Sequence, residues 1–537
     1  MDSGKGMNTI AGDVDSEVDL VVLGGGGAGL CAALAATEKG CGNILVLEKR
    51  SSATGNSAMG GGPFAAESPV QRRQGIDAPR DKYFKTAMSF ANWKINPRIV
   101  RAFVDKSGDT IRWLEELGVK FQPLPSSSAV AADVPNAPAQ ATRRSLGSFV
   151  TEPPITYHVP EGEGAAMMKM LRQACDKRGV RILVDTKAEK ILTDKNGRIS
   201  GVLASSPTDV IRVAARAVII ATGGYGDNKD LLKKYCPNYR EGMDYQGVPM
   251  LTGDGLIMAT EVGAAVENAG TLLLEGPLVP TSILLNIVGK GGERIKLPLV
   301  ALAWEPTLLW VNKNGERFIT EDDAGPFNGG NAIAIQPDNI AFVLFDAATV
   351  QRIAQRGGLR GSPLRNAPLG AQRGPLPNLH EELVSQAEAG RMRISDSLEE
   401  IAHWIGADPA ILKASIDEYN AACDEGCDRL FAKQSKNLIP VREPPFYALK
   451  CSSAFLDTIG GIKINERMEV VSETDKSIPG LYAAGVITGG WQSETYCAHL
   501  LGSARGFALN SGRIAGESAA KFLRSAPSLK DNVTGTP

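Results

Sequence analysis

With 537 residues, the chain is longer than one hydrophobic core usually supports, so we expect two or more domains. A net charge of −2 argues against general attraction to nucleic acid or to an anionic membrane surface. Hydrophobic residues make up 43% of the chain, but no run of about 18 apolar residues occurs, so no transmembrane helix is predicted. The polar residues 1–16 look like a disordered lead rather than a signal peptide, which favours a cytoplasmic protein.

Residues 19–48 predict a strand, a tight turn, a helix and a parallel strand, in that order. The first apolar run enters a G-x-G-x-x-G pattern at Gly24, Gly26 and Gly29, and the second ends on Glu48. In such a unit the glycines permit a sharp turn, close approach of a pyrophosphate and tight helix packing. Amides at the helix N-terminus bind phosphate, and the acid accepts hydrogen bonds from ribose. The pattern therefore predicts a Rossmann-like domain that binds an adenine dinucleotide.

Further glycine-rich segments indicate that the dinucleotide is a flavin. A nicotinamide enzyme has no general need for a second such segment after the acid, whereas a buried flavin needs backbone close against its ring and pyrophosphate. The second segment spans residues 54–62. A predicted strand at 218–220 ends in the sequence ATGG, and the sequence IPGLYAAG at 478–485 precedes a helix-like run at 501–523.

The middle of the chain has a different character. Short strands near residues 182–184, 189–192 and 200–203 predict an antiparallel excursion between about 181 and 217. Residues 276–445 begin with proline-bearing segments and contain two amphipathic stretches, at 398–405 and 409–423, that predict helices. We interpret this region as an inserted cap domain.

These motifs resemble, in the same order, those of the flavoprotein family of fumarate reductases and succinate dehydrogenases, which has soluble members and includes relatives such as the 3-ketosteroid dehydrogenases. The resemblance covers roughly residues 17–525 and rests on the sequences GGGGAG, LEK, TGNSAMGGG, EGEG, ATGGYGDN, LTGDG, NGERF, GGIKIN and IPGLYAAG. It implies an α/β fold with a discontinuous Rossmann-like FAD-binding domain and an inserted α+β cap. The expected layout is a lead at 1–16, FAD-binding parts at 17–275 and 446–525, a cap at 276–445 and a tail at 526–537.

The resemblance also implies which residues contact FAD. We expect the flavin to be non-covalent, because the family's covalent form uses a histidine and residues 54–62 contain none. The implied contacts are Gly24, Gly26, Ala28, Gly29, Glu48, Lys49, Thr54, Gly55, Asn56, Ser57, Gly60, Gly61, Gly62, Ala188, Ala221, Thr222, Gly223, Gly224, Asp254, Gly485, Ser503 and Ala504.

The positions that hold and protonate fumarate in the family are altered in this chain. Gly325 stands where the resemblance places a proton-donating arginine, and residues 274–277 read LEGP where a histidine normally precedes proline. His499 stands roughly at the position of a substrate-binding arginine. Because charge-bearing positions are lost, we expect a substrate other than fumarate.

Candidate catalytic residues remain beside the flavin-contacting turn. Tyr496 is the leading candidate for proton transfer, as tyrosines are in the ketosteroid dehydrogenases, and its alternative is a packing aromatic. His499 and the nearby Trp491 could contact a less charged substrate, and His158 is a weaker candidate. Arg317 matches a family motif and is either catalytic or a salt-bridge partner within the cap.

The predicted function is hydride transfer between flavin N5 and a C=C or C–C bond α,β to a carbonyl or carboxylate, in either direction. The scattered cysteines complete no zinc or iron–sulfur ligand set, so no metal is expected and electrons must come from, or go to, an external partner. One alternative is a desaturase of cyclic ketones like the 3-ketosteroid dehydrogenases. The other, of a different class, is a non-catalytic flavin subunit that relays electrons.

Overall fold

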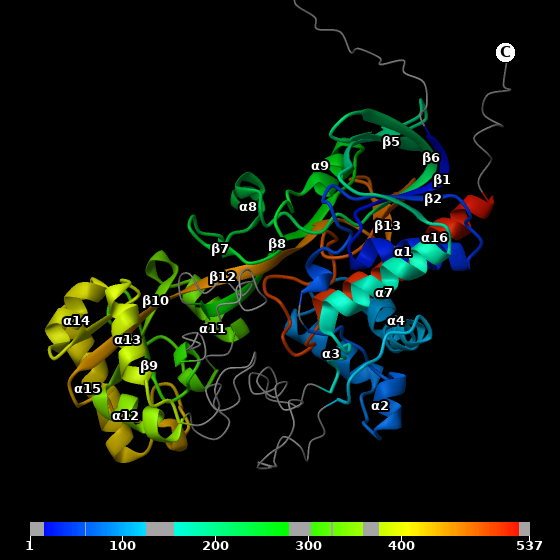
Figure 1. Cartoon of the computed structure of the whole chain (residues 1–537). Coiled ribbons are helices and arrows are strands. Elements are labelled where there is room, and N and C mark those ends of the chain that lie inside the picture. Colours follow the sequence, from blue (N-terminus) through cyan, green and yellow to red (C-terminus); the bar gives the residue numbers. More distant parts are fainter. Residues whose placement is uncertain are drawn as a thin grey trace, which may run out of the picture.

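The computed structural model describes residues 16–59, 61–124, 155–278, 302–323, 326–357 and 375–525. Two lobes lie side by side, and one strand, β12 (Phe446–Ile462), runs through both of them (Figure 1). The predicted tail at 526–537, and all but the last residue of the lead at 1–16, lie outside the described ranges.

A mostly parallel sheet forms the centre of the first lobe. Its strands lie in the order β13 (Glu469–Val471), β14 (Ser477–Ala483), β6 (Val210–Ile220), β1 (Ser16–Leu23), β2 (Ile44–Leu47) and β3 (Arg181–Leu183). β1 pairs in parallel with both β2 and β6. The two neighbours of Leu23 are therefore Leu47 and Ile220, and all three are buried. The strands read as apolar runs because parallel sheets are covered on both faces. The predicted α/β class and the strand–turn–helix–strand unit are confirmed.

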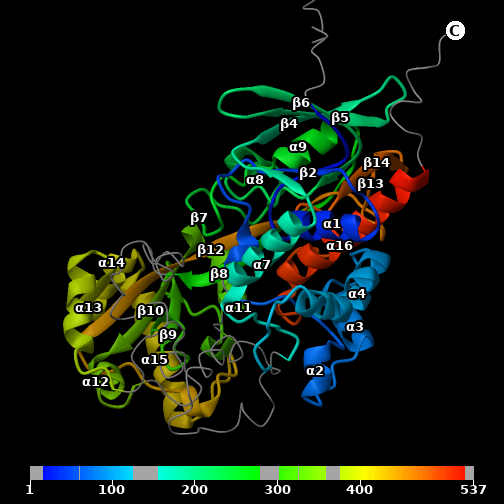
Figure 2. The same cartoon turned by 45° about the vertical axis from the view of Figure 1, so that its right-hand side comes forward.

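Three helices, α1 (Gly27–Glu38), α7 (Glu163–Lys177) and α16 (Ser503–Ser525), pack together beside this sheet (Figure 1). Small residues allow α1 and α16 to approach closely. A Cβ atom on Gly512 or Gly516 would lie 2.2 or 2.1 Å from the carbonyl oxygens of Ala28 and Ala32. The other helices of this lobe are α2 (Pro69–Arg73), α3 (Arg80–Phe90), α4 (Pro97–Glu116), α8 (Lys229–Tyr235) and α9 (Asp254–Glu261), and Figure 2 shows the first three below α1 and α16.

The predicted antiparallel excursion is smaller than expected. β4 (Lys187–Thr193) pairs antiparallel with β5 (Ile199–Ser205), and β5 pairs antiparallel with β6. The first expected strand is instead β3, in which Ile182 lies opposite Val46 in a parallel pair with β2. Because β3 follows α7, it closes a parallel crossover of the kind that requires a helix between the strands.

The second lobe is built on a sheet with strand order β11 (Met392–Ser395), β12, β10 (Ile340–Asp346) and β9 (Leu309–Asn312). Successive residues of these strands belong to different cores: Trp310 and Val343 face one, whereas Val311 and Leu344 face the other. The first core includes α12 (Ala347–Arg356) and α13 (Leu379–Glu388). The second core includes the two predicted helices, observed as α14 (Leu398–Ile405) and α15 (Pro409–Glu425).

The second half of β12 connects the lobes. It pairs antiparallel with β8 (Val266–Leu278) and, over two residues, in parallel with β7 (Asp244–Tyr245). α11 (Pro326–Ala334) packs on β8 and β12 where the lobes meet. The expected boundary after residue 275 falls within β8, and the domain boundaries stay predictions. Within the described residues, no helix has both the length and the apolar character needed to cross a membrane.

Candidate active site

The turn between β1 and α1 has no room for side chains at two of its glycines. Gly24 has a φ of +104°, and a Cβ atom there would lie 2.4 Å from the carbonyl oxygen of Ala221. A Cβ atom on Gly29 would lie 1.9 Å from the carbonyl oxygen of Gly24, so α1 sits directly on the turn. At Gly26, by contrast, the nearest such contact is the Cα atom of Gly55 at 4.0 Å. The N-terminus of α1 therefore has space beside Gly26 for a phosphate group.

Glu48 ends β2 with its carboxyl group against this turn. Its Oε2 accepts a hydrogen bond from the Gly25 N–H at 2.7 Å, and its Oε1 accepts one from the Arg50 N–H at 2.9 Å. Each carboxylate oxygen keeps a further lone pair, so ribose hydroxyls can still donate to Glu48. Lys49 points elsewhere, and its Nζ donates to Asp254 at 2.7 Å.

The second glycine-rich segment lies on the other side of the turn. The side-chain amide of Asn56 donates to Asp457 at 2.8 Å, and its oxygen accepts from the Val248 N–H at 2.7 Å. The Ser57 side chain lies against Gly27. Gly61 has a φ of +96°. Gly60, which is predicted to contact FAD, lies outside the described residues.

The ATGG segment supplies a test of whether the site fits a cofactor. The hydroxyl oxygen of Thr222 is buried and has no hydrogen-bond partner among the described residues. Buried hydroxyls in folded proteins are nearly always paired, so an unpaired one at the end of β6 fits a bound ligand. Gly485, just after β14, lies close to α1: a Cβ atom on Gly485 would be 3.2 Å from the Cβ atom of Ala28. These features fit FAD.

The other predicted contacts are placed as follows. Ala188 is buried in β4, Gly223 and Gly224 follow β6, and Ser503 and Ala504 begin α16. The structure thus brings segments from both ends of the chain to the carboxyl ends of the parallel strands, where ligands bind in open α/β sheets. The individual FAD contacts stay predictions.

Tyr496 precedes α16 in the chain, and its hydroxyl oxygen accepts a hydrogen bond from the N–H of Ala504, in the first turn of that helix, at 3.3 Å. Its side chain is buried, and its ring centroid lies 5.4 Å from that of Phe327 in α11. Burial raises the pKa of Tyr496 to about 12, so the phenol keeps its proton at neutral pH. Tyr496 therefore lies between the first lobe and the helix that packs on β8.

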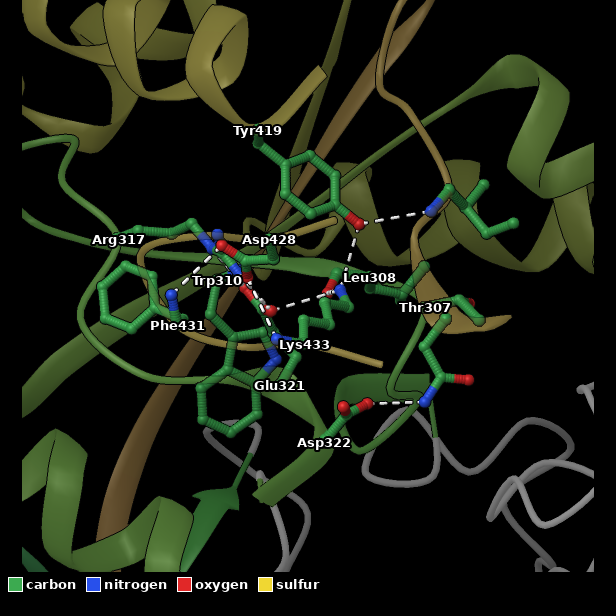
Figure 3. Close-up of polar contacts among 12 residues, drawn as sticks. Thr307, Leu308, Trp310, Arg317, Glu321, Asp322, Tyr419, Asp428, Phe431 and Lys433 are labelled. Atoms are coloured by element: carbon green, nitrogen blue, oxygen red, sulfur yellow. Dashed lines mark hydrogen bonds and ion pairs between the residues drawn. The ribbon is translucent and has the colours of Figure 1, made fainter. Parts of the chain in front are cut away.

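Arg317 does not lie with Tyr496. Its guanidinium donates to Glu321 at 2.9 Å and to Asp428 at 2.8 Å, in the buried cluster of Figure 3. Lys433 completes this cluster, 3.1 Å from Glu321 and 3.0 Å from the hydroxyl of Tyr419. This placement supports the salt-bridge alternative and speaks against catalysis by Arg317. Gly325, the position of the missing arginine, lies outside the described residues.

The other candidates near the turn make contacts of different kinds, and their roles stay predictions. His499 is exposed and meets Phe90 edge-on, with ring centroids 5.9 Å apart. Trp491 stacks on Phe507 in the core at 4.2 Å, so it is a packing residue. His158 is fully buried: its Nε2 lies 2.6 Å from the Ser68 hydroxyl and its Nδ1 lies 2.9 Å from the Thr156 carbonyl. Burial lowers the pKa of His158 to about 4, which indicates a neutral structural ring.

The sequence did not suggest three further residues near Tyr496 as catalytic. Two of them meet at Gly61, where a Cβ atom would lie 1.9 Å from the Tyr157 hydroxyl oxygen and 3.6 Å from a guanidinium nitrogen of Arg505. Tyr157 and Arg505 are electrostatic neighbours of Tyr496 and of each other, and Glu275 is a neighbour of Tyr157. Arg505 also donates to the carbonyl of Met59, within the second glycine-rich segment, at 2.6 Å. Burial raises the pKa of Tyr157 and lowers that of Arg505. We call Tyr157, Glu275, Tyr496 and Arg505 the tyrosine cluster.

Weak signals for these residues were present in the sequence. Tyr157 precedes His158 in the segment before EGEG, and Arg505 follows the glycine-rich entry to the last helix. Glu275 occupies the altered segment before Pro277. Their proximity could not be predicted, because three distant parts of the chain meet there.

The model of a family described as FAD binding domain matches residues 19–497. Vinyl phenol reductase of Lactiplantibacillus plantarum is 30% identical, over 94% of this chain and 96% of the relative. Urocanate reductase of Eggerthella lenta is 27% identical, over 88% of this chain and 70% of the relative. NADH:fumarate oxidoreductase of Klebsiella pneumoniae is 27% identical over 94% of this chain, which spans about half (48%) of that relative.

Solved structures show the same fold. The 3-ketosteroid Δ4-(5α)-dehydrogenase of Rhodococcus jostii superposes with a TM-score of 0.70 at 23% identity, covering 96% of this chain and 99% of that structure. The open conformation of a flavocytochrome c3 fumarate reductase superposes with a TM-score of 0.65 at 24% identity, covering 95% of this chain and 79% of that structure.

Proposed function

Because the chain belongs to the FAD binding domain family, we propose that it transfers a hydride to or from a carbon–carbon bond conjugated with a polar or aromatic group. It binds FAD and is an oxidoreductase that acts on such bonds. Relatives named for the reduction of vinyl phenol and urocanate support the reductive direction. A separate electron donor or acceptor completes the cycle.

The tyrosine cluster carries this proposal. The hydride would come from, or go to, N5 of FAD when the cofactor is bound. In the reductive direction, one carbon of the double bond gains that hydride and the other gains a proton from the Tyr496 hydroxyl. The Ala504 N–H, which donates to the same oxygen, stabilises the phenolate that results. Arg505 adds a positive charge next to Tyr157 and Tyr496, which favours the same state.

The charge of the cluster limits the substrate. Arg505 is the cation among the described residues of the tyrosine cluster, and it is offset by the nearby carboxyl groups of Glu163 and Glu275. A dicarboxylate placed there would lack the second cation that it needs. The aromatic rings of Tyr157, Tyr496 and Phe327 instead suit a flat substrate with at most one carboxylate.

The test is to photoreduce the protein without oxygen and follow flavin absorbance while adding candidate acceptors separately. We would use fumarate, cinnamate, a hydroxystyrene, a cyclic enone and a steroid enone. Rapid reoxidation by an aromatic or cyclic compound is expected, and reoxidation by fumarate alone would refute the substrate assignment. Reoxidation by oxygen or a quinone only would favour the desaturase or the non-catalytic electron relay.

Replacing Tyr496 with phenylalanine removes the proposed proton donor and keeps the ring. We expect Y496F to slow reoxidation by the substrate about 10²- to 10⁴-fold, the usual contribution of general acid catalysis. Flavin content and its absorbance spectrum should not change. Y482F is the matched control, because Tyr482 is a buried tyrosine of the same lobe whose hydroxyl faces the Ser518 carbonyl. Equal rates for the wild type and Y496F would exclude Tyr496 as the donor.

A further inference from the structure

A surface cavity opens in the first lobe, where the N-terminus of α4 meets β8. Its volume is about 570 Å³, and it is lined by residues 93–98 together with Glu267 and Glu466. The Asn96 N–H donates to the Gly490 carbonyl at 2.8 Å, which joins the start of α4 to the segment that follows β14. The tyrosine cluster contributes none of the lining residues. A cavity of this size can hold a small organic molecule.

Glu267 is fixed in the wall of this cavity by backbone contacts. It pairs with Gly461 of β12, and a Cβ atom on Gly489 would lie 2.1 Å from the Glu267 carbonyl oxygen. A Cβ atom on Gly490, whose φ is +83°, would lie 2.9 Å from the Oε2 atom of Glu267. The position of the carboxyl group is therefore defined by direct contacts, with Oε2 packed against Gly490.

The carboxyl group of Glu267 is poorly solvated. Its Oε2 is buried and has no hydrogen-bond partner among the described residues. Its Oε1 accepts no hydrogen bond there either, but it is not sealed from solvent, so it faces the cavity that Glu267 lines. The nearby charges of Lys463 and Asp475 pair with each other at 2.6 Å, and burial raises the pKa of Glu267. A cation bound at Oε1 would stabilise the charged form of this acid.

The basic residues of the wall do not compensate Glu267. Lys94 pairs with Glu494 at 2.7 Å. Arg98 is exposed, so water can solvate its guanidinium group. The carboxylate that lacks a counterion is thus the one that is also desolvated. A bound cation would remove this imbalance, whereas a bound anion would increase it.

Two further residues of the wall suit an organic cation. Glu466 adds a second carboxyl group to the lining. The side chain of Trp93 is 61% exposed, which is unusual for so large an aromatic residue. An exposed indole ring can contact an apolar body and can attract a cation over its face. The wall therefore combines carboxyl groups with an available aromatic surface.

We propose that this cavity binds a small organic cation, whose protonated amine or guanidinium group lies at Glu267 and Glu466 and whose apolar body lies against Trp93. The cation donates a hydrogen bond to the Oε1 atom of Glu267. The cavity is a second small-molecule site, separate from the site of hydride transfer. Binding there involves no covalent step and does not depend on the proposed reaction.

The test compares a cation with an uncharged molecule of the same shape. Binding of 2-phenylethylamine and 2-phenylethanol to the FAD-loaded protein is measured by calorimetry. For the wild type, we expect the amine to bind about tenfold or more tightly than the alcohol, as for a charge-assisted hydrogen bond. E267Q removes the charge and keeps the shape, so it should bring the ratio of dissociation constants close to one. W93L should weaken binding of the amine about two- to fivefold, the size of an exposed cation–π contact.

E261Q provides the matched control. Glu261 is exposed at the end of α9 and does not line the cavity, so the substitution makes the same change in charge elsewhere on the lobe. The ratio for E261Q should equal that of the wild type. A wild-type ratio near one would contradict the proposal, and so would equal ratios for E267Q and the wild type.

Flavin content and the thermal midpoint show whether E267Q is folded. If it is not, a crystal structure of the wild type with 2-phenylethylamine decides. A nitrogen atom within hydrogen-bond distance of the Glu267 carboxyl group would support the proposal. A nitrogen atom bound elsewhere, including at the tyrosine cluster, would overturn it.

Discussion

Asp457 links the second glycine-rich segment to the strand that both lobes share. Its Oδ2 accepts a hydrogen bond from Asn56 at 2.8 Å, and its Oδ1 accepts one from the Thr458 N–H at 3.0 Å. Burial nevertheless raises the pKa of Asp457 to about 7. The folded protein therefore binds this proton more tightly than the unfolded chain does. This contribution to stability is complete below about pH 4 and is lost as the pH rises to 7.

Replacing Asp457 with asparagine should remove that pH dependence. The difference between 3.8 and about 7 corresponds to at most about 4 kcal/mol of unfolding free energy, at about 1.4 kcal/mol per pH unit. We expect the stability of the wild type to fall more steeply than that of D457N between pH 4 and 7, as measured by urea denaturation. D244N, at an exposed position of the neighbouring β7, should follow the wild type. Parallel curves for the wild type and D457N would contradict the raised pKa.

Single residues were predictable from the sequence where the backbone sets the requirement. Gly24 and Gly29 were assigned from spacing alone, because the absence of a Cβ atom is a local demand of the turn. Arg317 and His499 were placed by motif position, which does not show what surrounds a side chain. The burial of Arg317 between two acids, and the exposure of His499, depend on tertiary packing.

In the β1–turn–α1 element, backbone atoms pack directly against each other at glycines, which leaves no space for a Cβ atom. We expect G29A to bind FAD at least about tenfold more weakly, because a Cβ atom 1.9 Å from the Gly24 carbonyl oxygen must displace the turn or the helix. The measurement is flavin retained per protein after gel filtration, followed by FAD titration of the apoprotein. G42A is the control, because a Cβ atom on Gly42 meets nothing within 4 Å. Normal FAD binding by G29A would show that the turn adapts.

Element types were predicted well, whereas strand partners were predicted less well. Helices α14 and α15 were expected from their apolar periodicity, and their start residues agree with the structure. β3 was assigned to the antiparallel excursion because it lies next to β4 in the chain. Its parallel pairing with β2 requires α7 to cross back over the sheet. The short apolar sequence of β3 does not indicate which strand it will pair with.

The two lobes have separate hydrophobic cores, and the buried cluster of Figure 3 belongs to the second lobe. Burial by itself would raise the pKa of Glu321, but the positive charges of Lys433 and Arg317 hold that pKa below its ordinary value. Two cations and two carboxylates balance one another, and Lys433 also donates to the Leu308 carbonyl at 3.2 Å. The cluster thereby joins β9 to α15 and to the segment that follows it.

Replacing Lys433 with methionine should destabilise the second lobe and spare the first. Removing one partner of a buried charge cluster costs about 3–5 kcal/mol, because the remaining charges are left uncompensated. We expect K433M to lower the thermal midpoint while flavin content stays normal. K413M is the control: it breaks the exposed pair of Lys413 with Asp417 in α15 and should change stability by less than about 1 kcal/mol. Loss of flavin at the same temperature as loss of the second lobe would show that the lobes unfold as one.

β12 restricts how the two lobes can move relative to each other. Ser452 pairs with β10 of the second lobe and also with β8, and the register with β8 shifts before Ala454. The joint is thus a strand hydrogen-bonded on both sides rather than a loose linker. Translation of one lobe would break these bonds, whereas torsion about the strand axis would preserve them. The cap should therefore rotate relative to the flavin lobe about the axis of β12, and it should not slide across that lobe.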